Sequence, residues 1–572
     1  MELKELRLSK HLTQVQCAKI AGVSLRTYKK YESDSTPADS LRYKAIYRAI
    51  ETYSPFIDKK NQISQFLTNV KTDDDLIPLC KVVAKYKKRE CFEYLRSYIE
   101  GSYEGRVCIL YGLRRTGKTT MLFQMISELP LDKTAYIKVQ TTDTMSSLTK
   151  DLEKLNKLGY CYIFIDEITL LEDFINTAAV LSDIFSMIGM KIVLSGTDSL
   201  SFAMADRDEL YDRDVMIHTS FIPFKEYARL LNIPLVDTYI EYGGTLKKEN
   251  MSFDDEDIRF DEVSFRDDES TRKYIDTAIS RNIQNALKNN RFGLYFNALL
   301  ELYDKNELTN VINRIIESMN HQFLLSVVES EFKSHDLGSA KNLLLYDAPL
   351  PRAHILYDVD SKQIIGRLKE IIDVKEREDL SVIITQAHIE TIKKYLRMLD
   401  LIYNCPYRVE NGSPKDYYIF TQPGMRYSIA KALVYSLMQD AYFNTVLEKD
   451  KEYIVEKILN DVKGRMLEDI VLLETVKTLP SKKSAFKFRF DEGGEFDMVI
   501  YDSEENSCSI YEIKHSDKVA ENQVKHLLDD QKCGVVESRF GRIKGKYVLY
   551  RGETLNKGSI DYINVEEYLL GL

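Results

Sequence analysis

The chain has 572 residues and a formal net charge of −10, with 44% hydrophobic and 29% charged residues. These values exclude a disordered chain and predict a globular protein with several separate cores. No apolar run approaches the ~20 residues that a membrane helix needs, and the N-terminus lacks a signal-peptide core, so we expect a cytoplasmic protein without a membrane partner. The eight cysteines form no C-x-x-C pair and indicate reduced core residues, not zinc ligands or disulfides.

The first fifty residues predict a basic, helical module. They carry ten lysines and arginines against five aspartates and glutamates, whereas the whole chain is acidic. We expect a helix over residues 3–10, a second from 12 to 21, and a third over residues 25–32 that Ser24 caps after a turn at Gly22. Two short helices joined by a glycine turn are the geometry that places a recognition helix in the major groove of DNA.

The segment LKELRLSKHLTQVQCAKIAGVSLRTYKKYE resembles the Cro and phage-repressor (XRE-like) class of helix-turn-helix proteins, although Cys17 stands where the family prefers leucine. The resemblance implies DNA as a partner, with a phosphate at the start of the second helix and base edges along the third. The implied DNA-binding residues are Thr13, Gln14, Leu25, Arg26, Lys29 and Lys30. Arg26 and Lys30 have the chemistry to bind guanine. The alternative is a protein-docking module, and DNA reading would require a homo-oligomer.

Residues 107–129 predict a binding site for a nucleoside triphosphate. A short strand over residues 107–111 precedes the sequence GLRRTGKTT, and a helix is expected over residues 121–129. This order matches the phosphate-binding loop G-x-x-x-x-G-K-[ST], in which backbone amides surround the phosphates, Lys118 contacts the terminal phosphates and Thr119 binds Mg²⁺. We therefore expect ATP and Mg²⁺ as cofactors, with GTP as the alternative nucleotide. The expected binding residues are Gly112, Arg115, Thr116, Gly117, Lys118, Thr119 and Thr120.

Residues 160–167 predict a buried parallel strand that ends in two acids. Beside a phosphate loop, Asp166 would hold Mg²⁺ through water and Glu167 would orient the attacking water. The alternative is that both acids only cap the following helix. The next such strand, residues 191–194, is followed by SGTDS, where Ser195 would sense the γ-phosphate or, equally, cap a turn.

The middle of the chain predicts a helical region with few motifs. Residues 219–227 are expected to close the ATPase core, and Arg213 before them is a candidate arginine finger for a neighbouring subunit, with a surface ion pair as the alternative. Residues 253–269 are densely acidic and predict a solvated insert. Residues 270–340 predict amphipathic helices. Residues 389–408 and 417–420 predict a helix and β-wing, a winged helix that contacts DNA or packs domains together.

Two alternating segments near the C-terminus, residues 495–501 and 508–514, predict a β-hairpin. A turn centred between residues 504 and 505 would place Asp497 opposite Glu512, and Glu495 opposite Lys514, on one face of the sheet. Facing carboxylates repel each other unless a divalent cation lies between them. Two acids that hold Mg²⁺, with a lysine beside the attacking water, are what phosphodiester hydrolysis needs.

Asp497 and the triplet Glu512-Ile513-Lys514 resemble the PD-(D/E)xK nuclease superfamily. The resemblance implies that Glu468, on an upstream helix, completes a metal site with Asp497 and Glu512. The residues expected in catalysis across the whole chain are Glu167, Arg213, Glu468, Asp497, Glu512 and Lys514. The alternative for the C-terminal region is an inactive nuclease-like fold with solvated acids.

The order of motifs GLRRTGKTT, IFIDE, SGTDS, SFIPFKEY and GRMLED…EFD…YEIK resembles prokaryotic AAA+-type (archaeal-ATPase-like) proteins with a C-terminal PD-(D/E)xK nuclease-like domain. The N-terminal module is an addition to that pattern. The expected fold is a multidomain α/β chain. Its parts are an all-α helix-turn-helix (1–55), a helical linker (56–95), a P-loop α/β ATPase core (96–232), a helical lid with the acidic insert (233–345), a winged helix (346–450) and an α/β restriction-endonuclease-like domain (451–572).

The leading interpretation is an ATP-controlled DNA-binding nuclease, an ATPase and Mg²⁺-dependent endodeoxyribonuclease that cleaves foreign DNA in prokaryotic defence. Its trigger would be a protein or phage-derived partner. One alternative is a nucleotide-responsive transcription regulator with an inactive nuclease-like domain. Another is a protein-assembly switch in which neither end of the chain contacts DNA. The joint presence of Glu468, Asp497, Glu512 and Lys514 favours the enzyme, because an inactive domain has no evident reason to keep a repulsive acid pair.

Overall fold

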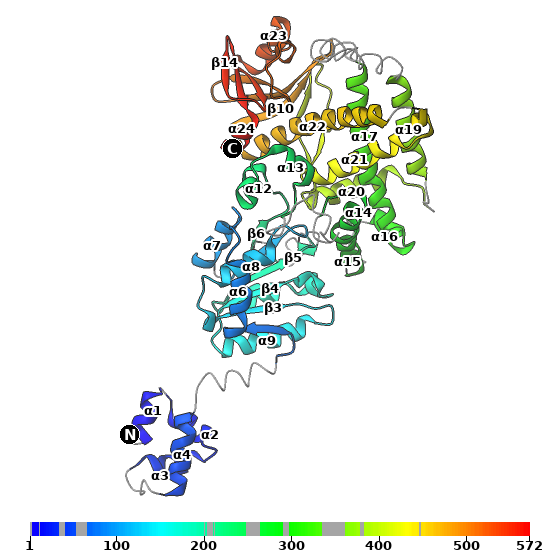
Figure 1. The fold of residues 1–572 in the computed structure, drawn as a ribbon. Coiled ribbons are helices and arrows are strands. Elements are labelled where there is room, and N and C mark those ends of the chain that lie inside the picture. Colours follow the sequence, from blue (N-terminus) through cyan, green and yellow to red (C-terminus); the bar gives the residue numbers. More distant parts are fainter. Residues whose placement is uncertain are drawn as a thin grey trace.

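The computed structural model describes most of the chain and consists of helices and two large sheets (Figure 1). The described residues are 3–10, 12–33, 40–52, 66–103, 105–198, 201–202, 210, 212–246, 264–289, 297–333, 361–377, 382–445 and 448–572. The acidic run expected at residues 253–269 therefore lies mostly outside them. Among the helices described, none is both long and apolar enough to cross a membrane.

The N-terminal module is a cluster of four helices with a core of its own. The helices are α1 (Leu3–Ser9), α2 (Gln14–Ile20), α3 (Leu25–Glu32) and α4 (Leu41–Thr52). Ser24 accepts a hydrogen bond from the Thr27 amide at 3.1 Å, so it caps α3 as predicted. Cys17 and Tyr28 are fully buried where α2 and α3 pack together. The predicted helical module is confirmed, with α4 added to it.

The ATPase core is built on a six-stranded sheet whose strand order is β1-β3-β4-β5-β2-β6. Its strands are β1 (Asn69–Thr72), β2 (Val107–Tyr111), β3 (Thr134–Lys138), β4 (Tyr162–Asp166), β5 (Lys191–Gly196) and β6 (Asp214–His218). All are parallel except β1, which pairs antiparallel with β3. The strands predicted at residues 107–111, 160–167 and 191–194 are β2, β4 and β5. These parallel strands end at one edge of the sheet, which brings the phosphate loop, Asp166 and Ser195 together.

Helices cover both faces of this sheet, and both interfaces are apolar. On one face lie α6 (Ile77–Val83), α7 (Phe92–Glu100) and α8 (Lys118–Ile126), and on the other α9 (Met145–Lys157), α10 (Phe174–Thr177) and the π-helix η4 (Leu181–Ser186). Strand β1 and helix α6 fall in the segment expected as a helical linker (56–95). The described part of that segment belongs to the ATPase core instead, because β1 pairs with β3 and α6 packs on α8.

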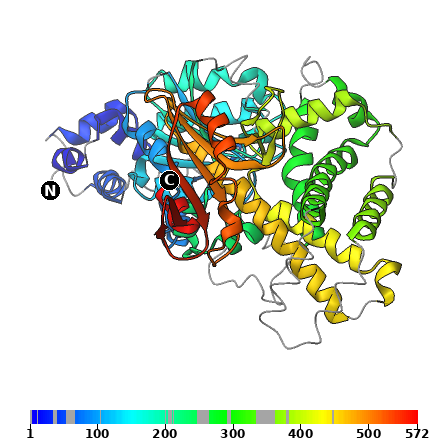
Figure 2. The same ribbon diagram turned by 90° about the horizontal axis from the view of Figure 1, so that it is seen from above.

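A helical region follows the core and lies to one side of the C-terminal sheet when seen from above (Figure 2). Two short helices, α12 (Phe224–Leu231) and α13 (Val236–Tyr242), lead into it. The helices that follow are α14 (Asp268–Ile275), η5 (Asp276–Ser280), α15 (Arg281–Asn289), α16 (Asn297–Asp304), α17 (Leu308–Lys333), α19 (Ser361–Arg377), α20 (Gln386–Met398) and α21 (Pro423–Met438). The helices expected over residues 270–340 are present within the described residues.

The segment expected as a winged helix does contain a helix and a two-stranded antiparallel sheet. Helix α20 is followed by β7 (Ile402–Asn404) and β9 (Tyr418–Phe420), which pair with each other. The connection between them supplies a further strand, β8 (Tyr407–Val409), which pairs in parallel with β10 (Lys483–Arg489) of the C-terminal sheet. A boundary at residues 450/451 therefore cuts through a continuous sheet.

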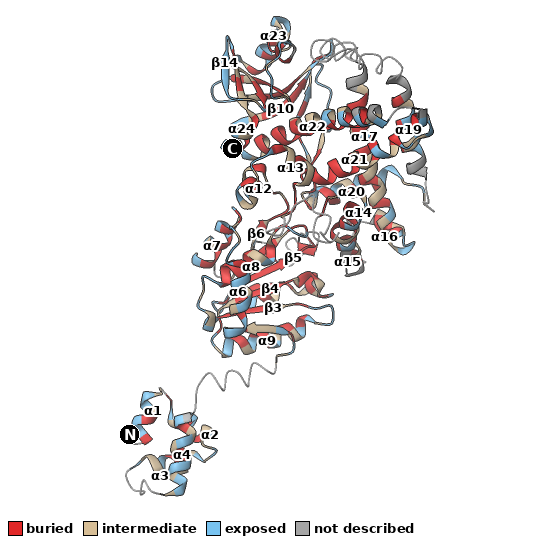
Figure 3. Ribbon diagram, in the orientation of Figure 1, coloured by how far each residue is buried: buried red, intermediate tan, exposed pale blue. Residues whose placement is uncertain are grey.

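The C-terminal unit is a seven-stranded mixed sheet with the order β14-β15-β13-β12-β11-β10-β8. Its further strands are β11 (Glu495–Asp502), β12 (Ser507–Ile513), β13 (Arg542–Tyr550), β14 (Leu555–Lys557) and β15 (Ile560–Asn564). The long helix α22 (Glu448–Thr478) and α24 (Val565–Gly571) pack on one face, and α23 (Asp530–Phe540) packs on the other. Figure 3 shows that buried residues gather on the strands of both sheets and on α22.

One apolar core joins the last helices of the ATPase region to the C-terminal unit. It contains residues of α12 and α13, of α17, α19 and α21, and of the α22-covered face of the C-terminal sheet. The boundary expected at residue 232 therefore falls inside this shared core. Helices α12 and α13, which follow β6 of the ATPase core, therefore pack against the C-terminal unit.

Candidate functional site

The phosphate loop lies between β2 and α8 and is fixed by the residues that follow β6. Gly112 has φ +145°, and a Cβ there would lie 2.5 Å from Thr219 Oγ1 and 2.9 Å from the Ser220 amide nitrogen. Thr116 Oγ1 lies 2.8 Å from Thr219 Oγ1, and the Leu113 amide donates to Ser220 Oγ at 3.0 Å. Only glycine fits at position 112, and the sequence analysis missed the role of Thr219 and Ser220 as supports of the loop.

Lys118 and Thr119 begin α8, directly after Gly117 in a left-handed conformation. Lys118 Nζ donates to the carbonyl oxygens of Gly112 and Leu113, both at 2.7 Å, and burial lowers the pKa of Lys118 to about 8. Thr119 Oγ1 donates to Asp166 Oδ2 at 3.1 Å. Thr120 is partly buried in the same first turn. The hydroxyl and the carboxylate that were expected at Mg²⁺ are therefore adjacent, and oxygen donors are what Mg²⁺ requires.

The two acids at the end of β4 have different surroundings. Asp166 Oδ2 also accepts hydrogen bonds from Tyr136 at 2.9 Å and Lys138 at 3.0 Å. Although burial opposes it, the Lys138 ammonium holds the pKa of Asp166 below its usual value. Glu167 follows with φ +60° and accepts a 3.5 Å hydrogen bond from Thr197. A left-handed glutamate is strained, and such strain is typical of functional positions.

Ser195 and Thr197 continue this edge of the sheet. Ser195 is buried and pairs in register with Asp166. Thr197 is contacted by Asn282 of α15, whose side-chain amide donates to the Thr197 carbonyl at 2.8 Å. Helix α15 belongs to the helical region expected as a lid, so this region contacts the segment expected to sense the γ-phosphate. Asn282 carries no sequence signal, because it lies within an ordinary amphipathic helix.

A buried arginine outside the predicted motifs links the phosphate loop to α12. Arg89 donates to the carbonyl oxygens of Thr116, Thr219 and Phe221 at 2.7 to 3.0 Å. Its guanidinium also forms a bidentate ion pair with Glu226, at 2.8 and 2.9 Å. Since both partners are nearly inaccessible to solvent, removing one would leave an uncompensated buried charge.

Two arginines expected at the ATPase site lie in different places. Arg115, in the loop, donates to Ser264 at 3.1 Å, and its carbonyl oxygen accepts from the Leu246 amide at 3.0 Å. Arg213 precedes β6, at the edge of the sheet opposite the phosphate loop, and pairs with Asp183 at 2.8 Å. Within one chain, Arg213 is therefore distant from the loop, and a finger role in a neighbouring subunit stays a prediction.

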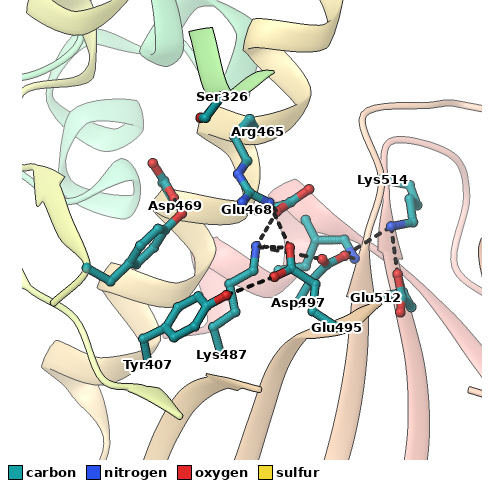
Figure 4. A network of polar contacts seen from close by, with 12 residues as sticks. Ser326, Tyr407, Arg465, Glu468, Asp469, Lys487, Glu495, Asp497, Glu512 and Lys514 are labelled. Atoms are coloured by element: carbon teal, nitrogen blue, oxygen red, sulfur yellow. Dashed lines mark hydrogen bonds and ion pairs between the residues drawn. The ribbon is translucent and has the colours of Figure 1, made fainter. Parts of the chain in front are cut away.

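The C-terminal hairpin has the predicted register. Met498 pairs with Tyr511 and Tyr501 with Cys508, so one further step places Asp497 opposite Glu512. Asp497 Oδ2 accepts hydrogen bonds from the Ile513 amide at 2.8 Å and from Lys514 Nζ at 3.0 Å. Lys514 Nζ also lies 2.6 Å from Glu512 Oε2. The three residues expected from the sequence motif therefore form one contact network (Figure 4).

Glu495, which was not predicted, lies close to Asp497 and Glu468, and a metal role for Glu512 stays a prediction. Ligand oxygens of Glu468, Glu495 and Asp497 lie within 4.8 Å of one another, which makes them the possible metal group found among the described residues. Glu468 comes from α22, as the resemblance implied. Three carboxylate oxygens at this spacing suit Mg²⁺, and the donor set therefore fits the ion.

Two further cations, Arg465 and Lys487, lie among these acids. Arg465 donates to Glu468 at 2.6 Å and to Glu495 at 3.0 Å, and Lys487 Nζ lies 2.7 Å from Glu468 and 2.9 Å from Glu495. Although burial opposes it, Glu468 raises the pKa of Lys487 well above its ordinary value. Successive side chains of a strand point to opposite faces of the sheet. Phe486 and Phe488 face α23, so this alternation was the available signal that Lys487, between them, points to α22.

Asp497 and Glu512 have pKa values displaced in opposite directions. Burial raises the pKa of Glu512 well above its usual range, and the charge of Asp497 adds to this. Burial also acts to raise the pKa of Asp497, but the charges of Lys514 and Lys487 outweigh burial and lower this pKa. The remaining oxygen of Glu512, Oε1, is buried and makes no hydrogen bond among the described residues. Paired carboxylates displaced in this way are typical of functional sites.

The N-terminal module places its candidate DNA contacts on α2 and α3. Arg26, Lys29 and Lys30 are exposed on α3. Leu25 is partly buried and packs against the module's core, and the Gln14 amide bonds to Glu32. Thr13 caps α2 by accepting from the Gln16 amide at 3.3 Å. The three basic residues and Thr13 therefore form the exposed part of the predicted surface.

Comparisons with known proteins support two parts of the chain. Residues 104–228 match the family model described as an AAA domain, and residues 3–51 match the model described as a helix-turn-helix. The chain carries a helix-turn-helix and an AAA domain. An uncharacterized protein of Methanocaldococcus jannaschii is 26% identical over 179 residues, which are 30% of this chain and 39% of that protein. The chain thus spans about two fifths of this relative's length.

Similar solved structures have low scores. The Saccharomyces cerevisiae Hsp104–ADP complex matches 73% of this chain and 55% of its own, with 13% identity and a TM-score of 0.23. The Aeropyrum pernix ORC1 protein in complex with DNA matches 64% of this chain and 98% of its own, with 12% identity and a TM-score of 0.22. These TM-scores are too low to carry an argument about function.

Proposed function

We propose that this protein is a DNA-binding ATPase whose C-terminal unit is a Mg²⁺-dependent nuclease controlled by the nucleotide. The AAA domain supports ATP hydrolysis, with Thr119 and Asp166 at Mg²⁺ and Glu167 at the attacking water. The helix-turn-helix supports DNA as the partner. The observation that carries the nuclease is the contact network of Asp497, Glu512 and Lys514 beside Glu468 and Glu495.

The order of elements in the C-terminal unit supports the same proposal. Helix α22 is followed by three antiparallel strands, β10, β11 and β12, then by α23 and the parallel strand β13. This arrangement agrees with the restriction-endonuclease-like fold expected from the motif. It brings Glu468 from the helix to Asp497 and Lys514 at the hairpin.

The chemistry proposed for this site is hydrolysis of a phosphodiester bond. Glu468, Glu495 and Asp497 would hold Mg²⁺, which supplies an activated water and neutralises charge on the phosphate. Lys514, held between Asp497 and Glu512, would contact the phosphate and stabilise the charge that develops on its oxygens. Glu512, the acid whose pKa is raised, would take up or deliver the proton that the step requires.

Control by the nucleotide is supported by the position of α13. After α13, the Leu246 amide donates to the carbonyl of Arg115 in the phosphate loop at 3.0 Å. On α13 itself, Asp237 accepts from His515 at 2.6 Å, and His515 directly follows Lys514. One short helix thus connects the phosphate loop to the residue beside the proposed nuclease lysine. We propose that loop movements on ATP binding or hydrolysis reach Lys514 by this route.

The test is a plasmid-nicking assay with purified protein, Mg²⁺ and ATP. The wild type should nick supercoiled DNA, and Lys514→Ala should abolish nicking. Lys118→Ala should remove the dependence of nicking on ATP. Lys483→Ala is the control, because Lys483 lies on the neighbouring strand β10 but pairs with Asp502 at the other end of β11 from Glu495. Equal nicking by all four proteins would contradict the proposed site.

A second candidate is a nucleotide-responsive transcription regulator with an inactive nuclease-like unit. It is favoured by one observation: Lys487 and Arg465 neutralise the acids that would bind Mg²⁺. This candidate predicts ATP-dependent binding to a specific DNA site and intact plasmid in the assay above. A role in defence against foreign DNA belongs to the first candidate and would be tested by phage plating on cells that carry the wild type or Lys514→Ala.

A further inference from the structure

The buried ammonium of Lys487 lies at the centre of the proposed metal group. Its Nζ is 2.7 Å from Glu468, 2.9 Å from Glu495 and 3.9 Å from Asp497, so it contacts or approaches all three acids. The side chain is 1% exposed. Lys514, by contrast, lies on the other side of Asp497 and contacts its second oxygen. Asp497 therefore separates two lysine-centred halves of the network, as Figure 4 shows.

An ammonium and a divalent cation exclude each other at this position. Mg²⁺ and Mn²⁺ bind carboxylate oxygens at about 2.1 Å, closer than the oxygens of Glu468 and Glu495 lie to Lys487 Nζ. An ion bound to the three acids would therefore lie almost on Nζ, and both are positively charged. Arg465 Nη1 contacts the same oxygens of Glu468 and Glu495 as Lys487 Nζ does. Lys487 Nζ also approaches Asp497 and so lies where the three acids meet.

The backbone of Lys487 is tied to the helical region. Its amide donates to the carbonyl of Pro406 at 3.1 Å, and Lys487 pairs with Tyr407 of β8. Strand β8 comes from the connection between β7 and β9, which pack with the helical region. The residue that fills the metal position is thus attached to the segment that joins the ATPase region to the C-terminal sheet.

We propose that Lys487 is a built-in counter-cation that occupies the place of a divalent metal ion. The C-terminal unit then binds Mg²⁺ or Mn²⁺ only when the Lys487 side chain withdraws from Glu468, Glu495 and Asp497. The inference rests on the proposed function, in which the three acids are the metal ligands of a nuclease site. It concerns metal binding alone. It makes Lys487 an inhibitor of the site, whereas Lys514 remains its reactive lysine.

The test measures Mn²⁺ binding to the full-length chain without nucleotide, by calorimetry. Lys487→Met removes the charge and keeps the stem of the side chain, so Mn²⁺ should bind about tenfold tighter or more than to the wild type. Adding Glu495→Gln to Lys487→Met should abolish that gain, because it removes a metal ligand. Lys483→Met is the matched control on the same strand and should leave Mn²⁺ binding unchanged.

Thermal unfolding supplies a second readout, the melting temperature with and without Mn²⁺, which also serves for a variant that is less stable without the ion. Lys487→Met and the milder Lys487→Gln remove one cation from the three acids and leave Arg465 beside Glu468 and Glu495. Each variant should therefore melt below the wild type and recover with Mn²⁺, which binds only the folded site. Equal Mn²⁺ affinity in wild type and both variants, or a gain that survives Glu495→Gln, would overturn the proposal. The proposal would also be overturned if the wild type bound Mn²⁺ tightly and Glu495→Gln removed that binding. A failure of every variant to cut DNA would instead contradict the nuclease.

Discussion

Glu474 is a buried carboxylic acid at the junction between the two sheets. It lies on α22, and its Oε1 accepts the amide hydrogen of Phe224, the first residue of α12, at 2.7 Å. Burial raises the pKa of Glu474 to about 8. In the folded chain the acid is therefore protonated at neutral pH, whereas in the unfolded chain it ionises near its ordinary value of 4.5.

The stability of this junction should fall as the pH rises. Between about pH 4.5 and 8 the folded state holds one more proton at Glu474 than the unfolded state, so the free energy of unfolding decreases by up to ~1.4 kcal/mol per pH unit. Glu474→Gln keeps an acceptor for Phe224 and removes this slope. Urea unfolding at pH 5 and pH 8 measures it, with the exposed Glu456→Gln on the same helix as control. An unchanged slope in Glu474→Gln would contradict the assignment.

Helix α13 is the element on which the proposed control depends. Asp237 near its start binds His515 at 2.6 Å and Arg551 at 3.0 Å. Although burial opposes it, His515 lowers the pKa of Asp237, so the carboxylate is charged. At its other end, the chain returns to the phosphate loop through Leu246.

Asp237→Ala should uncouple the two ends of the chain. ATP hydrolysis should stay within about twofold of the wild type, since Asp237 lies outside the nucleotide site, while ATP should no longer change DNA nicking. Paired ATPase and nicking assays measure both effects. Glu504→Ala in the exposed β11–β12 turn is the control. Retained ATP dependence in Asp237→Ala would assign the coupling to another contact, such as that between α21 and α22.

Elements near each other in sequence were predicted well. The phosphate loop depends on nine consecutive residues, and the hairpin register follows from alternation and a polar turn, so both could be read locally. The sequence analysis missed Arg89 and Lys487. Glu226, the partner of Arg89, lies more than 100 residues away, and Glu468, a partner of Lys487, lies on another element. No local pattern distinguishes Arg89 from a surface charge, whereas alternation with Phe486 and Phe488 was the local signal for Lys487.

At the scale of the whole molecule, the N-terminal module should act independently of the rest. Its buried residues form a separate core within α1 to α4. Arg26 and Lys30 are exposed on α3, and replacing both by alanine should weaken specific DNA binding by about 10- to 100-fold while ATP hydrolysis is unchanged. Fluorescence anisotropy with a selected DNA site measures this, with the exposed Lys4→Ala on α1 as control. Undiminished binding would favour the protein-docking alternative.

By itself, the sequence determined the order of the units, the phosphate loop, the acids after β4 and the hairpin that carries Asp497, Glu512 and Lys514. Each depends on residues within about twenty positions of one another, where periodicity and turn chemistry act. Only the tertiary structure decided that Glu495 joins Glu468 and Asp497, that Lys487 lies among them, and that α13 connects the phosphate loop to His515. The contacts among the acids arise where α22 packs on β10 and β11, and the contact at His515 arises where α13 lies beside the end of β12. Side-chain packing between separate elements cannot be read from the pattern of one segment alone.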